Sequence, residues 1–214
     1  MKIFLDSSDV EAVRKAAETG LVSGITTNPS IIAKSGRKME DVIRDLVEII
    51  PDHISVEGIG DTAAEMVEEG LRYRELGRQI VVKVPMTMEG MKAVPILESK
   101  GIPVNVTMAF SATQANLAMQ SGASYVSIVL SRLDAIASES FQLIEDTMII
   151  KENYGYTSEI IAGSVKTQNH LLDCLRAGVD IATIPPGLFD LMFKHPLTEA
   201  ALAGFKKDWA KLPK

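Results

Sequence analysis

The stretch Ile80-Val81-Val82-Lys83-Val84-Pro85 has the alternation and the β-branched composition of a buried strand. Successive side chains of a strand point to opposite faces, so Ile80, Val82 and Val84 share one face and Lys83 lies on the other. In a closed barrel one face of each strand meets the surrounding helices and the other points into the lumen. The stretch therefore predicts a barrel strand with an inward-facing lysine near its C-terminal end.

Similar short runs alternate with helical runs along the whole chain. Eight strands are predicted, at residues 2–6, 24–27, 54–58, 80–85, 103–108, 125–130, 160–165 and 181–184. Strands that alternate with helices pair in parallel through right-handed crossovers. Eight such units close most economically into a barrel, with an open doubly wound sheet as the alternative. We therefore expect an α/β protein, a single (β/α)8 TIM barrel over residues 1–214 with an extra C-terminal helix at 198–212.

Composition narrows the class of protein. The 214 residues are 46% hydrophobic and 23% charged, which supplies both a large core and a solvated surface. The net charge of −6 is spread along the chain, so no basic patch indicates a nucleic-acid partner. No apolar run approaches the roughly 18 residues of a membrane span. The single cysteine, Cys174, cannot form an internal disulfide, and we expect a cytoplasmic protein.

Polar or ionisable side chains mark the C-terminal ends of six predicted strands: Asp6, Glu57, Lys83, Asn105 with Thr107, Ser127 and Ser164. Barrel enzymes keep their active sites at this end. Apolar surroundings favour the neutral amine of a lysine such as Lys83, which makes it a candidate nucleophile. The alternative is a lysine that snorkels, or that pairs with a carboxylate for structure alone.

Two carboxylates, Asp6 and Glu57, are expected in the same mouth. Forming and breaking C–N and C–C bonds needs several proton transfers, which suit a pair of acid/base groups. Either carboxylate could instead only balance the charge of Lys83. The neutral side chains of Asn28, Asn105, Thr107 and Ser127 suit sugar hydroxyls, although each could as well cap a helix or bond to the backbone.

Arg132, Ser164 and Lys166 follow the sixth and seventh predicted strands, where barrel enzymes often bind phosphate. The alternative is a pair of ordinary solvated cations. His53, His170 and His195 lack the spacing of a metal site. There is also no glycine-rich phosphate loop and no nucleophile elbow, so we predict neither a metal nor an organic cofactor.

Several stretches together form a specific pattern: Phe4-Leu5-Asp6, Gly24-Ile25-Thr26-Thr27-Asn28-Pro29-Ser30, Val82-Lys83-Val84-Pro85-Met86-Thr87, Asn105-Val106-Thr107, Phe110-Ser111, Gln114-Ala115 and Lys194-His195-Pro196-Leu197-Thr198. In this combination the chain resembles the transaldolase family nearly from end to end. The similarity is greatest to its small, single-domain branch, which includes the fructose-6-phosphate aldolases.

The resemblance implies a role for each polar residue of the mouth. Lys83 would form a Schiff base with a ketose, Asp6 would move the proton on the hydroxyl at the cleaved bond, and Glu57 and Thr107 would position a water molecule. The substrate-binding set that it implies comprises Thr26, Asn28, Asn105 and Ser127 for the dihydroxyacetone unit, and Arg132, Ser164 and Lys166 for the phosphate.

The activity implied by the resemblance is that of a transaldolase of the pentose phosphate pathway. Sedoheptulose 7-phosphate and glyceraldehyde 3-phosphate would give erythrose 4-phosphate and fructose 6-phosphate. The alternatives are a fructose-6-phosphate aldolase, a transaldolase acting on a sulfosugar, or a non-catalytic barrel that binds sugar phosphates. Val129 stands where transaldolases of the family carry phenylalanine and the aldolases tyrosine, and Glu57 stands where the aldolases carry glutamine. Both differences argue against aldolase activity.

The last predicted helix carries Leu202, Phe205, Trp209 and Leu212 at spacings of three and four, which form one apolar stripe. This helix could fold back on its own barrel. We favour packing against a neighbouring subunit, because the resemblance implies a homo-oligomer, a ring-shaped pentamer or a decamer of two rings.

Overall fold

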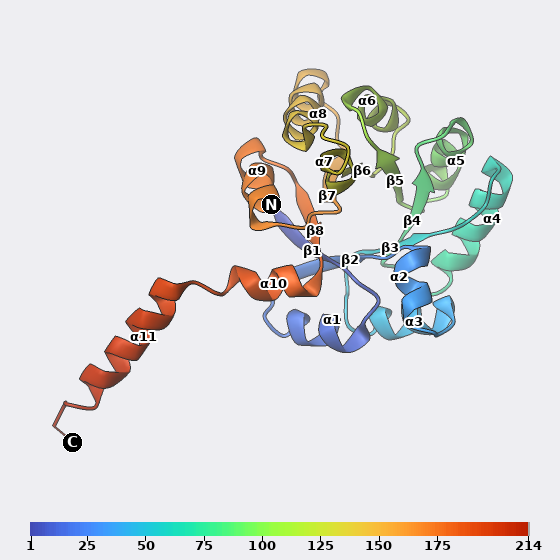
Figure 1. Cartoon of the computed structure of the whole chain (residues 1–214). Coiled ribbons are helices and arrows are strands. Elements are labelled where there is room, and N and C mark those ends of the chain that lie inside the picture. Colours follow the sequence, from blue (N-terminus) through green and yellow to red (C-terminus); the bar gives the residue numbers. More distant parts are fainter. Residues whose placement is uncertain (214) are drawn as a thin grey trace.

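The computed structural model of the chain describes residues 1–213 and shows a closed barrel whose eight strands follow one another in sequence order (Figure 1). All neighbouring strands pair in parallel, including β1 with β8. The strands are β1 (Lys2–Asp6), β2 (Val22–Thr26), β3 (Ile54–Glu57), β4 (Ile80–Pro85), β5 (Val104–Ala109), β6 (Tyr125–Val129), β7 (Glu159–Gly163) and β8 (Ile181–Ile184). The predicted (β/α)8 TIM barrel is confirmed, and the doubly wound alternative is wrong.

Helices connect the strands and lie around the barrel, and the last two follow β8 (Figure 1). They are α1 (Val10–Ala17), α2 (Pro29–Lys34), α3 (Met39–Val47), α4 (Ala63–Arg74), α5 (Met88–Ser99), α6 (Ala112–Gln120), α7 (Ser131–Asp134), α8 (Ser140–Tyr154), α9 (Gln168–Ala177), α10 (Pro186–Met192) and α11 (Pro196–Trp209). Close packing of helices on strands has a local cause at Gly70 of α4. A Cβ there would come within 2.8 Å of Leu97 Cδ2 and 3.3 Å of Val82 Cγ1, so only glycine lets α4 lie this close.

The β4 stretch divides its side chains as the alternation predicts. Ile80, Val82 and Val84 are almost fully buried in the main hydrophobic core between strands and helices. Lys83 points to the other face, into the lumen, where its register partners are Glu57 on β3 and Asn105 on β5. The parallel register thus brings three polar side chains from separate strands to one level of the barrel.

The lumen changes in character along its axis. Its closed end, at the N-terminal ends of the strands, contains a small apolar cluster of Phe4, Ile161 and Ile181, against which Tyr125 packs. Towards the C-terminal ends of the strands the inward side chains are polar, and they line the mouth. The inner part of the lumen is therefore shielded from water, whereas its mouth is open to solvent.

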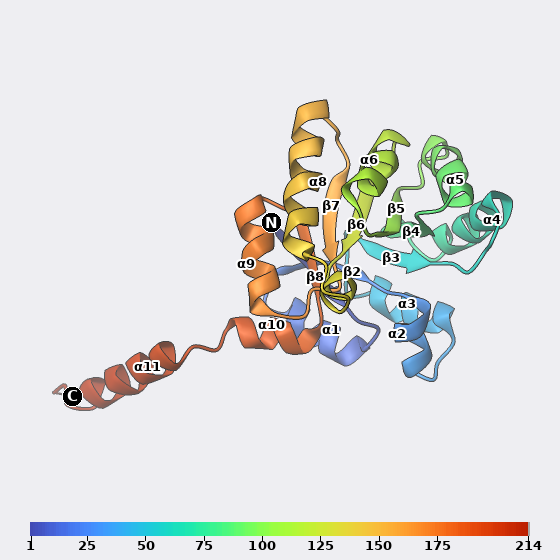
Figure 2. The same ribbon diagram turned by 45° about the horizontal axis from the view of Figure 1, so that its top comes forward.

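The C-terminal helix α11 extends away from the barrel in both views (Figures 1 and 2). It runs from Pro196 to Trp209, slightly earlier than the predicted 198–212, and none of its residues is buried. The alternative in which it folds back on its own barrel is therefore not observed. Its large apolar side chains are more than half exposed: Leu197, Leu202, Phe205 and Trp209, with Leu212 just beyond. Within residues 1–213, no helix is long and apolar enough to cross a membrane.

Candidate active site

A cavity of about 480 Å³ opens at the C-terminal ends of the strands. This volume is in the range of small-molecule sites. All predicted site residues except Asn105 line it: Asp6, Thr26, Asn28, Glu57, Lys83, Thr107, Ser127, Arg132, Ser164 and Lys166. The cavity is also lined by residues outside the predicted set, among them Lys34 on α2 and Thr183 on β8.

Lys83 is held at the floor of this cavity. Its side chain is 9% exposed, and its Nζ lies 3.0 Å from Glu57 Oε2 and donates to the carbonyl oxygen of Thr27 at 3.0 Å. An ammonium group has three hydrogens, so these two partners leave one for the cavity. The lysine is therefore buried, as predicted, and it is also paired with a carboxylate, as the structural alternative supposed.

Asp6 reaches the cavity from the end of β1. Thr26 Oγ1 donates to Asp6 Oδ1 at 3.0 Å, and the hydroxyls of Thr26 and Thr183 lie 2.7 Å apart. The side chain of Thr26 thus holds the Asp6 carboxylate in place. Thr183 was not in the predicted set, although its alternation along the strand at 181–184 could have placed it on the inward face.

Asn105 lies one layer below the cavity rather than on its wall. It is fully buried, its Oδ1 accepts from Ser127 Oγ at 2.8 Å, and its Nδ2 donates to Ser55 Oγ at 3.1 Å. Asn28 does line the cavity, but its Oδ1 also caps α2 by accepting from the backbone N–H of Ile31 at 2.9 Å. Its amide nitrogen is the part left for a ligand.

The cations Arg132 and Lys166 lie on α7, the short helix after β6, and on the loop after β7. One histidine joins α7 to this loop: His170 Nδ1 accepts from the backbone N–H of Lys166 at 3.3 Å, and its Nε2 lies 2.9 Å from Asp134 Oδ2 on α7. Neither His170 nor Asp134 was predicted to serve the site, because the contact depends on how α7 and α9 meet. Helix α7 and the loop after β7 are thereby tied into one wall.

Backbone strain gathers at the same cavity. Ser164 and Met108 both line it and have positive φ angles, of 57° and 64°. This conformation is costly for residues other than glycine, and such strain clusters at functional sites. At Ser164 it accompanies a short contact between the hydroxyls of Ser164 and Ser131, at 2.6 Å.

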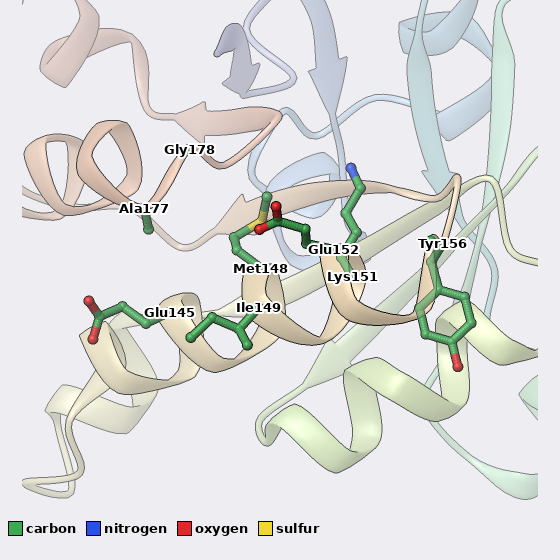
Figure 3. Close-up of a pocket in the computed structure, with 9 residues that line it drawn as sticks. Glu145, Met148, Ile149, Lys151, Glu152, Tyr156, Ala177 and Gly178 are labelled. Carbon is green, nitrogen blue, oxygen red and sulfur yellow. The ribbon is translucent and has the colours of Figure 1, made fainter.

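A second cavity of about 590 Å³ lies beside α8, between that helix and the end of α9 (Figure 3). Its one lysine, Lys151, pairs with Asp180 at 2.6 Å, and Asp180 also accepts from the backbone N–H of Ile160. This lysine therefore serves the structure, and the larger cavity lacks the convergent polar groups of the first. Within residues 1–213 no three His, Cys, Asp or Glu side chains are grouped to hold a metal ion.

A closed barrel with a buried lysine, two carboxylates and two cations around one mouth is the arrangement of an α/β-barrel enzyme. Sequence comparison identifies its family. The family described as Transaldolase/Fructose-6-phosphate aldolase matches residues 3–214, and the chain belongs to this family.

Relatives named "Probable transaldolase" match over the full chain. Those of Aquifex aeolicus (strain VF5) and Geobacter sulfurreducens are each 47% identical to it, and that of Hydrogenobaculum sp. (strain Y04AAS1) is 45% identical. The matches cover 100% of this chain and 98%, 100% and 98% of the respective relatives. The family resemblance of the sequence is thereby confirmed.

Proposed function

We propose that the protein is a transaldolase that carries a dihydroxyacetone unit between sugar phosphates as a Schiff base on Lys83. In the direction written from the seven-carbon sugar, sedoheptulose 7-phosphate and glyceraldehyde 3-phosphate give erythrose 4-phosphate and fructose 6-phosphate. The observation that carries the proposal is the 3.0 Å contact between Lys83 Nζ and Glu57 Oε2 at the floor of the cavity.

This contact supplies the first proton transfer. The ammonium of Lys83 passes a proton to Glu57, and the free amine attacks the ketose carbonyl to give a carbinolamine. Glu57 returns the proton to the departing hydroxyl, which leaves as water, and an iminium remains. A water molecule held by Glu57 and Thr107 carries protons in these steps.

Asp6 acts next. It takes the proton from the hydroxyl on the carbon beyond the scissile bond, the C–C bond breaks, and its electron pair moves into the iminium to form an enamine. The shortened aldose leaves, and the enamine attacks the carbonyl of an acceptor aldose in the reverse sequence. The hydrogen bond from Thr26 keeps Asp6 oriented for this transfer.

The rest of the mouth binds substrate. Asn28 and Ser127 contact the hydroxyls of the dihydroxyacetone unit, and Asn105 orients Ser127 from below. Arg132, Lys166 and Ser164 bind the phosphate with two positive charges and a hydroxyl at the loops after β6 and β7.

Reductive trapping tests the proposal. Borohydride with fructose 6-phosphate should add a dihydroxyacetone-derived mass to the peptide that contains Lys83, as read by mass spectrometry. Lys83→Met should fold and lose both the adduct and the activity, whereas the control Lys151→Met should keep the adduct. An adduct on another lysine, or none with any ketose phosphate, would show that the mechanism is wrong.

Assays with and without an acceptor aldose separate the alternatives. A transaldolase turns over only with an acceptor, whereas an aldolase releases free dihydroxyacetone from fructose 6-phosphate alone. A sulfosugar donor is tested in the same assay. Binding of a sugar phosphate with neither a trapped adduct nor turnover, for every donor and acceptor pair, would favour the binding barrel.

We further propose that α11 packs against a neighbouring subunit in a pentamer or decamer. Its support is the helix itself, fourteen residues long with its apolar stripe exposed and no residue buried. Exposed aromatic residues such as Trp209 are costly in water and are enriched at interface hot spots.

A further inference from the structure

A chain of hydrogen bonds runs from the cavity floor into the closed end of the barrel. Ser127 Oγ donates to Asn105 Oδ1 at 2.8 Å, Asn105 Nδ2 donates to Ser55 Oγ at 3.1 Å, and Ser55 Oγ lies 2.6 Å from His53 Nε2. The four side chains come from β3, β5, β6 and the residue before β3, and none is more than 4% exposed. Only Ser127 reaches the cavity.

The hydrogen bonds of this chain of side chains all run in one direction. The Ser55 hydroxyl accepts from the amide of Asn105, and it has a single hydrogen of its own to donate. Within residues 1–213 the polar side-chain atom left to receive that hydrogen is His53 Nε2. We assign the hydrogen of this contact to the Ser55 hydroxyl, so that His53 Nε2 carries none and the neutral ring carries its hydrogen on Nδ1. Every donor in the chain points away from the cavity, and His53 is the last acceptor.

The surroundings of His53 keep its ring neutral, as an acceptor nitrogen requires. The rings of Phe4 and Tyr125 pack against the imidazole, with centroids 4.6 Å and 4.5 Å away. Its Nδ1 is buried without a hydrogen-bond partner among residues 1–213. Burial, and secondarily the nearby positive charge of Lys2, lower its pKa from 6.5 to about 3. Lys2 is itself paired with Glu159 at 2.7 Å.

Such a residue needs an explanation. A buried imidazole with one unpartnered nitrogen costs free energy that an apolar side chain would avoid. The chain of hydrogen bonds explains why the imidazole is kept, because the acceptor at His53 sets the direction of every hydrogen bond up to Ser127, which lines the substrate cavity. With its hydrogen donated downwards to Asn105, Ser127 presents only lone pairs to the cavity.

We propose that His53 is a positioning residue that makes Ser127 an obligate hydrogen-bond acceptor and so selects a donor substrate with a hydroxyl at that point. The inference rests on the proposed function, since it assumes that the dihydroxyacetone unit lies over Ser127. Without the acceptor at His53, the Ser55 hydroxyl turns to the Asn105 carbonyl and the amide flips. Ser127 then receives a hydrogen from below and points its own hydrogen into the cavity.

The test compares two small ketones, dihydroxyacetone and hydroxyacetone, which differ by one hydroxyl. Each is incubated with the full-length protein and borohydride, and the rate of adduct formation on Lys83 is measured. The wild type should favour dihydroxyacetone. His53→Phe keeps the aromatic packing but removes the acceptor, and the preference should fall about fivefold to tenfold, the value of one neutral hydrogen bond. His53→Gln, which keeps a side-chain acceptor, should restore most of it.

Ser55→Ala breaks the chain one step nearer the cavity and should lose the same preference. If His53→Phe fails to fold, this variant carries the test alone. The double variant should lose no more than either single one, whereas separate structural defects would add. An unchanged preference in a folded His53→Phe or Ser55→Ala overturns the inference. Absence of any Lys83 adduct in the wild type would instead overturn the proposed function.

Discussion

The amine of Lys83 and the carboxylate of Glu57 form an ion pair at 3.0 Å across two adjacent strands, with side chains only 9% and 14% exposed. Their Cα atoms are direct register partners of β4 and β3, so the backbone fixes the pair. Two opposite charges buried together are stable only with further hydrogen bonds, one of which the Thr27 carbonyl provides. When the ketose carbonyl reacts, this ion pair is lost and Lys83 Nζ forms a covalent bond to the substrate.

Glu57→Gln removes the proton acceptor while keeping the size of the side chain. We expect kcat for transfer to fall about 100-fold, the lower end of what general acid/base groups contribute. Lys83 trapping with fructose 6-phosphate should slow in parallel, and a stopped assay of both rates checks this. The control Glu11→Gln lies on the surface of α1, where the Glu11 side chain is 86% exposed, and should behave as wild type. Equal rates in the two variants would remove Glu57 from the proton transfers.

Arg132→Ala tests the phosphate site. A charge-assisted hydrogen bond contributes about 1.5–3 kcal/mol, so KM for fructose 6-phosphate should rise between about tenfold and 100-fold. Trapping of unphosphorylated dihydroxyacetone should change little. Arg176→Ala, on the exposed side of α9, is the matched control. Similar losses with both substrates would place the phosphate elsewhere.

Acid should destabilise the protein through His53. Its pKa is about 3 when folded and 6.5 in the reference state, so below pH 6.5 the unfolded chain binds a proton that the folded chain does not. Stability is then complete above pH 6.5 and falls as the pH drops towards 3, by up to about 1.4 kcal/mol per pH unit. Urea unfolding at pH 7, 6, 5 and 4 measures the slope.

His53→Gln is the control for this pH dependence. It removes the titrating group, so its free energy of unfolding should change less between pH 6.5 and 4 than that of the wild type. Carboxylates contribute to both proteins and cancel in the comparison. Parallel pH profiles would show that His53 is protonated in the folded state as readily as in the unfolded chain.

Deletion of residues 199–214 tests the role of α11. Particles should become smaller by light scattering, while circular dichroism keeps the barrel signal, because none of the residues of α11 is buried. Phe205→Ser with Trp209→Ser should give the same result without truncation. An intact protein that is already monomeric at micromolar concentration would contradict the proposed subunit contact.

The barrel could be predicted from the sequence alone. The alternation in the 80–85 stretch, repeated in seven other strands, reports which side chains face the lumen, and strand order follows from the repeating units. It also placed Lys83, Glu57 and Asp6 at one mouth, since the C-terminal ends of parallel strands meet at one end of a barrel. The motifs shared with the transaldolases added the family.

Which of these polar groups are in contact could not be predicted, because it depends on the three-dimensional packing of the strands and helices. Asn105 was predicted at the cavity, but the stagger of β5 against β6 buries it beneath Ser127, 22 positions along the chain. The contacts of His170 with α7 and with the loop after β7, and the hydrogen bonds that end at His53, depend equally on contacts between distant elements. The alternation along a strand shows which face each side chain is on, but not how far along the barrel axis it lies. Hydrogen bonds form only at about 3 Å, so the register, which the closed barrel fixes as a whole, selects the partners.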